Sequence, residues 1–112
     1  MKIKVSELTG AALDWAVMHC EYPNNTLQFF FKLRALHALH SSFYYSTNWA
    51  QGGPIIEREK IAVQSPNDKG WYARDYAFKT HTSGSTPLIA AMRCFVASKL
   101  GNTIEIPKEI AK

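Results

Sequence analysis

The segment that most constrains the fold is residues 86–101, which carries both a helix start signal and a helix stop signal. Thr86 can cap a helix with its hydroxyl, Pro87 suits the first helical position, and Gly101 is a typical stop. Between them, mostly apolar residues recur at helical spacing on one face: Leu88, Met92, Phe95, Val96 and Lys99 or Leu100. We therefore predict a helix that begins at Pro87, ends before Gly101 and packs on the rest of the domain.

A second segment, residues 46–60, has similar chemistry. Pro54 follows two glycines and precedes an apolar pair, and Glu57 and Glu59 suit the opening turns of a helix. These features predict a short helix over 54–60. The first N–H groups of both predicted helices lack acceptors within the helix, so each start is a potential anion site.

The N-terminal part of the chain predicts a strand followed by a helix. Residues 3–5 favour a short edge strand, and Ser6 can cap a helix over 7–20. Polar residues, among them Asp14, lie off an apolar stripe formed by Leu8, Ala11, Ala12, Trp15 and Met18. We expect Trp15 to lie in the core, and the helix to end at the turn residues 22–25.

The remaining segments predict further strands. Residues 28–34 alternate as a half-buried strand would, although 36–39 fit a helix equally well. Residues 61–63 and 71–79, joined by turn residues 65–70, indicate a hairpin, and 103–106 favour a last extended segment. We therefore predict a single α/β (α+β) domain over residues 1–112, with a small sheet of about four strands and about three helices packed on it.

Composition excludes several other classes of protein. The chain has 112 residues, 46% of them hydrophobic and 20% charged, which is typical of a compact globular domain. Charged residues interrupt both long apolar stretches, 27–39 and 88–96, and residues 1–5 lead into no signal region, so we expect a cytoplasmic protein without a membrane span. The net charge of +4 is scattered, which favours anionic partners without naming one.

No pattern in the sequence indicates catalysis or a bound metal. Cys20 and Cys94 lie far apart without a CxxC motif, so we expect two reduced, packed thiols. His37 and His40 have no carboxylate or cysteine at ligand spacing, and no serine lies in a nucleophile elbow. We therefore expect neither an enzyme nor a cofactor.

Several stretches resemble a known family: 2–17, 45–59, Gly70-Trp71 and 86–101 look like the NinX-like family of small tailed-phage and prophage proteins. The resemblance implies a phage accessory protein of undetermined biochemical activity, located in the bacterial host. More distantly, it implies similarity to phage domains described as an αβα sandwich. Asn48 stands where those domains lead one to expect an aspartate, which weakens any role for this position as a metal ligand or base.

In an αβα arrangement, helix starts that follow strands meet at one end of the sheet, where ligands bind. We therefore predict a pocket for an anionic, nucleotide-like small molecule, with hydroxyl and backbone donors, aromatic faces and arginines, in a homo-oligomer that sequesters a host immune signal. A protein-interaction surface over residues 29–45 is the alternative, and nucleic acid ranks last because no basic stripe is present. The predicted ligand-binding residues are Ser46, Thr47, Asn48, Trp49, Gln51, Gly52, Gly53, Arg58, Trp71, Arg74, Ser83, Gly84, Ser85 and Thr86.

Overall fold

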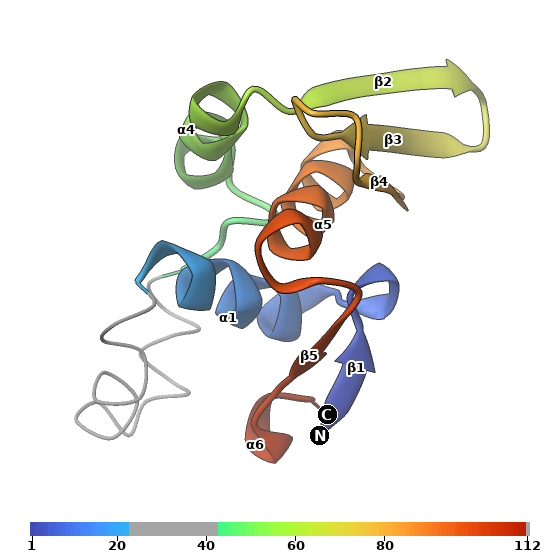
Figure 1. Cartoon of the computed structure of the whole chain (residues 1–112). Helices are drawn as coiled ribbons and strands as arrows, with labels where there is room; N and C mark the ends of the chain where they lie inside the picture. The colour runs from blue at the N-terminus through green and yellow to red at the C-terminus, as the bar shows by residue number, and fades with distance from the viewer. Residues whose placement is uncertain (23–42, 112) are drawn as a thin grey trace.

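The computed structural model describes residues 1–22 and 43–111. Its helices are α1 (Gly10–Glu21), α4 (Trp49–Glu59), α5 (Pro87–Leu100) and the one-turn α6 (Lys108–Ala111), with a 3₁₀ turn, η1, at Val5–Glu7. Its strands are β1 (Lys2–Lys4), β2 (Ala62–Asn67), β3 (Gly70–Arg74), β4 (His81–Gly84) and β5 (Thr103–Glu105), as Figure 1 shows. None of the helices in the described ranges combines the length and the hydrophobicity of a membrane span.

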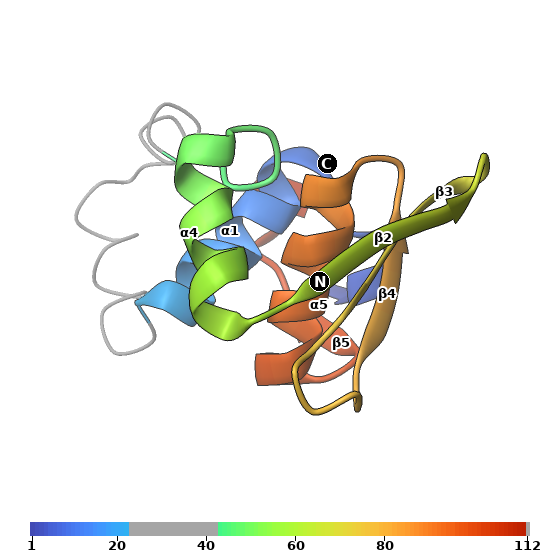
Figure 2. The same cartoon turned by 90° about the horizontal axis from the view of Figure 1, so that it is seen from above.

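The strands form two antiparallel sheets. One contains β2, β3 and β4 in that order, and the other pairs β1 with β5, with Ile3 opposite Ile104. The predicted α+β class is confirmed, although the strands divide between two sheets instead of forming one. Helix α5 packs on one face of the three-stranded sheet, and α1 and α4 pack on α5 (Figure 2). The described helices thus lie on one side of that sheet, whereas a sandwich would place helices on both.

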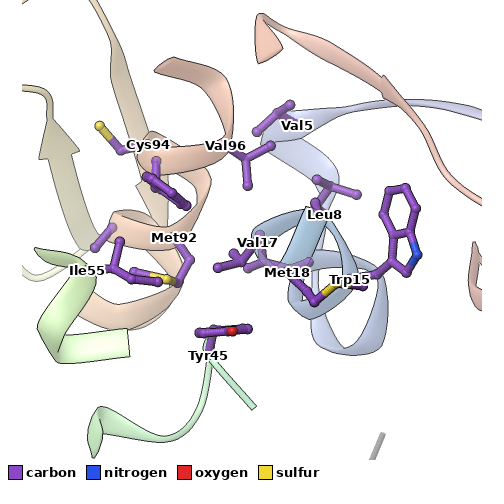
Figure 3. Packing of buried hydrophobic residues seen from close by; sticks show 14 of the residues in the cluster. Val5, Leu8, Trp15, Val17, Met18, Tyr45, Ile55, Met92, Cys94 and Val96 are labelled. Carbon is purple, nitrogen blue, oxygen red and sulfur yellow. The ribbon is translucent and has the colours of Figure 1, made fainter. Parts of the chain in front are cut away.

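Helix α5 is the centre of the core, and its predicted limits are confirmed. The Thr86 hydroxyl accepts a hydrogen bond from the Ile89 N–H at 3.1 Å, and Gly101 follows the last turn. Because α5 contacts the sheet, α1 and α4, it buries more than the single face predicted: Leu88, Ala90, Ala91, Met92, Cys94, Phe95 and Val96. In Figure 3, Met92 and Val96 of this helix lie near Val17 of α1, with the Tyr45 ring beneath them.

The start of α1 differs from the prediction. Residues 5–7 form η1, and α1 begins at Gly10 after Thr9, so Ser6 does not cap it. Asp14, which the helical stripe placed outside the buried face, is only 6% exposed. Trp15 is buried as predicted, and the helix ends at Glu21, next to the predicted turn.

The predicted hairpin is confirmed, with Val63 opposite Ala73, but its second arm ends at Arg74. Residues 75–80 instead form a turn, in which the Asp75 carboxylate accepts the N–H groups of Lys79 and Thr80 at 2.8 and 3.1 Å. The chain then returns as β4, a strand that was not predicted. The predicted extended segment at 103–106 is confirmed by β5, and the predicted strand at 28–34 lies outside the described residues.

Both thiols are free, with Cys94 buried and Cys20 half-buried, as predicted. Burial raises the pKa of Cys20 to about 12 and that of Cys94 to about 11. Near pH 8, about where an unperturbed thiol begins to ionise, we expect the folded protein to react with Ellman's reagent far more slowly than the protein unfolded in guanidinium chloride. Rapid reaction of two thiols in the folded protein would contradict this burial.

Candidate functional site

Helix α4 begins at Trp49, not at Pro54, so the predicted helix start is wrong. The Asn48 side chain caps the helix by accepting the Ala50 N–H at 2.8 Å, and the Asn48 carbonyl accepts the N–H groups of Gln51 and Gly52. Pro54 lies inside the helix, where it lacks the N–H that would bond to the Ala50 carbonyl. The helix N-terminus therefore follows Ser46 and Thr47 directly.

The N-termini of α4 and α5 lie at the same end of the molecule, and the two helices run side by side from there (Figure 2). A pocket of about 220 Å³ lies between the two helix N-termini. The structure thereby brings four of the predicted ligand residues together, with two apolar residues of α5 beside them. The lining residues are Ser46, Thr47, Trp49, Thr86, Leu88 and Ile89.

Ser46 is the most unusual residue of this pocket. Its N–H donates to a carboxylate oxygen of Asp14 in α1 at 2.8 Å, which anchors the turn before α4 to the core. The residue is 2% exposed, and its hydroxyl has no hydrogen-bond partner among the described residues. A buried hydroxyl without a partner is destabilising, so this position has an unused donor and acceptor next to two helix ends.

The other donors at the pocket belong to the helix starts. Asn48 and Thr86 each accept one first-turn N–H, those of Ala50 and Ile89. Trp49 is the first residue of α4 and Leu88 is the second residue of α5. Their N–H groups therefore have no acceptor within their own helices. Both helix ends carry partial positive charge, and the buried Asp14 carboxylate lies on the core side of Ser46.

Four predicted residues of α4 do not line the pocket. Gln51 accepts the Tyr44 N–H at 2.6 Å and so shapes the turn before the helix. Gly52 faces α5, and Gly53 lies beside the Trp49 ring. Arg58 lies near the far end of α4, where it pairs with Glu21 at 2.6 Å and Glu59 at 2.8 Å.

The predicted residues of the sheet also lie outside the pocket. Trp71 and Gly84 are paired across β3 and β4, Ser83 precedes Gly84, and Arg74 ends β3. Ser85 is exposed between β4 and the Thr86 cap. Of the predicted interaction surface over 29–45, only Phe43 to Tyr45 is described, and the buried Tyr45 ring stacks on Phe43 at 5.7 Å.

Arg93 in α5 makes two long-range contacts through its guanidinium. The guanidinium donates to the Leu8 carbonyl at 2.9 Å and to the Ser83 carbonyl at 2.8 Å, joining α5 to η1 and β4. Neither Arg93 nor Asp14 was predicted as a positioning residue. Their partners lie 85, 10 and 32 residues away in the chain, so no local pattern signals these contacts.

Comparison with known proteins gives one family. A family model described as "Bacteriophage P22, NinX" matches residues 4–99 and thus includes both sides of the pocket. No curated protein matches the chain. Within the described residues, no group of three or more histidine, cysteine, aspartate or glutamate side chains could hold a metal ion.

Proposed function

Because the chain belongs to the NinX family of bacteriophage P22, we propose that it is a non-enzymatic phage accessory protein that binds an anionic, nucleotide-derived small molecule between α4 and α5. The observation that carries the proposal is a pocket lined by the starts of both helices and by Ser46, whose buried hydroxyl has no partner among the described residues. A phosphoryl group has the oxygen acceptors that this hydroxyl and the neighbouring N–H groups lack.

The size of the pocket decides how much of the ligand it can hold. Its 220 Å³ lies below the roughly 300 Å³ at which pockets begin to enclose whole small molecules. A phosphoryl group therefore enters, and the rest of the ligand lies outside. Trp49 is 56% exposed at the pocket and offers an aromatic face on which a base can stack.

Such binding suits sequestration of a host immune signal in the bacterial cytoplasm, because sequestration needs affinity and not turnover. A second copy of the chain would cover the ligand portion that one shallow pocket leaves in water, so we propose that the protein acts as a homo-oligomer. Light scattering after gel filtration, with and without ligand, tests this against the 12.6 kDa mass of one chain.

Calorimetric titration with cyclic nucleotides and ADP-ribose derivatives tests the site. We expect one ligand class to bind saturably and Ser46→Ala to weaken that binding about 10-fold or more, because a hydrogen bond to a charged group is lost. Trp49→Ala should weaken it similarly through lost stacking. Ser46→Ala should not destabilise the free protein, since it removes a buried hydroxyl that has no partner.

Arg58→Ala is the matched control, because Arg58 belongs to the same helix but pairs with Glu21 and Glu59 away from the pocket. It should bind the ligand as the unchanged protein does. The proposal fails if no member of the panel binds, or if Ser46→Ala and Trp49→Ala retain full affinity.

A further inference from the structure

The face of the three-stranded sheet that points away from α5 carries a distinct set of side chains. On β3, the buried Ala73 faces the core, so its neighbours Tyr72 and Arg74 point the other way. On β4, the Thr82 hydroxyl donates to the Ala90 carbonyl of α5 at 2.8 Å, so His81 and Ser83 point outward. The pairing places Arg74 opposite His81 and Tyr72 opposite Ser83 on this outer face.

Two adjoining hollows form a groove that runs over this face and around the edge of the sheet at β4. The first, of about 430 Å³, is lined on the sheet by residues that include Gln64, Tyr72, Arg74 and His81. The second, of about 460 Å³, lies between β4 and the η1 region, and its lining includes Lys4. Tyr72, His81 and Thr82 line both hollows, so the groove is continuous from β2 past the edge of β4.

The charge of the groove has one sign. Lys4 and Arg74 are cationic, the His81 imidazole adds a hydrogen-bonding group, and no aspartate or glutamate appears among the described residues that line either hollow. These groups come from β1, β3 and β4, which explains why the sequence shows no basic stripe. A polyanion that lies along the groove would contact all three.

Exposed aromatic rings lie next to the groove. Tyr72 lines it, and Phe78, in the turn that follows β3, is more than half exposed. The Arg74 guanidinium lies 4.4 Å from the centre of the Phe78 ring, and Phe78 has a φ of 62°, which is unusual for a bulky residue. The Asp75 carboxylate holds this turn through the N–H groups of Lys79 and Thr80.

We propose that this groove binds single-stranded nucleic acid. Exposed rings stack on unpaired bases, and the lysine and arginine neutralise phosphates, which is the combination that single-strand-binding surfaces use. The Gln64 amide and the NH₂ group of Asn67, whose oxygen accepts the Lys69 N–H, add hydrogen-bonding groups for base edges. A duplex hides the base faces, so the rings would contribute little to duplex binding. The site is separate from the pocket between α4 and α5.

Fluorescence anisotropy with a labelled oligothymidylate of about a dozen nucleotides, within the range of known single-strand sites, tests the proposal. We expect saturable binding at low salt, Tyr72→Ala to weaken it about 5-fold to 100-fold, and Tyr72→Phe to preserve it. Arg74→Gln should weaken binding and reduce the slope of log affinity against log salt by about 0.7, the value for one phosphate contact.

Two control variants separate the groove from other features. Lys108→Ala removes a charge on α6 outside the groove and should bind nearly as the unchanged protein does. Ser46→Ala should bind the oligonucleotide normally, so failure of the small-molecule proposal would leave this one standing. The proposal is overturned if the oligonucleotide does not bind, if Tyr72→Ala binds normally, or if a duplex of equal length binds as tightly. Binding of a host or phage protein at the groove instead of the oligonucleotide would also overturn it.

Discussion

Gly52→Ala is expected to destabilise the protein by about 1–3 kcal/mol, the usual result of overpacking a core. A Cβ atom at this position would collide with the Tyr45 carbonyl oxygen and lie 2.7 Å from Cδ1 of Leu88. The leucine side chain can move, but the carbonyl belongs to the turn that Asp14 and Gln51 anchor. Relief of the collision would therefore require α4 to move away from α5, and urea denaturation followed by circular dichroism measures the loss.

Gly53→Ala is the matched control on the next residue of the same helix. Its Cβ would have only one neighbour within 4 Å, an atom of the Trp49 ring at 3.7 Å, which is an ordinary contact. Alanine in a helix is favoured over glycine by about 0.5–1 kcal/mol, so this variant should be more stable than the unchanged protein. If both variants shift stability in the same direction, the close approach of α4 and α5 at Gly52 is wrong.

The two helix starts show what local sequence can predict. Thr86, Pro87 and Gly101 all act within a few residues of their own position, and the structure confirms each of them. The helix start predicted from Gly52, Gly53 and Pro54 was wrong, because glycine and proline also occur inside helices. Gly52 permits close packing of two helices, and the proline lies within α4 while Asn48 supplies the cap.

The candidate pocket was predictable in part for the same reason. Ser46, Thr47 and Thr86 lie beside helix starts, and their types indicate hydrogen bonding at such positions. The role of Asp14 was not predictable, because its carboxylate belongs to a helix 32 residues earlier and serves the Ser46 N–H. The groove on the sheet was missed because a turn at 75–80 and the strand β4 replace the long second arm expected for the hairpin.

Arg93→Met is expected to lower the free energy of unfolding by about 2–3 kcal/mol, because it removes two charge-assisted hydrogen bonds and keeps a side chain of similar length. The carbonyls of Leu8 and Ser83 lose their donor, and the partly buried Leu8 carbonyl has the poorer access to water. Thermal denaturation measures the effect. Arg74→Met is the control, since that guanidinium contacts the exposed Phe78 ring and its removal should cost about 0.5–1 kcal/mol.

The same variant connects stability to the groove. Ser83 and residues of η1 line the second hollow, and the Arg93 guanidinium joins Ser83 to Leu8, the residue that follows η1. Its loss should allow β4 to separate from η1, so oligonucleotide binding should weaken even at temperatures where the protein stays folded. The pocket between α4 and α5 includes neither Ser83 nor a residue of η1, so binding there should be unchanged. Equal loss at both sites would instead mean that Arg93 supports the whole fold and not the groove in particular.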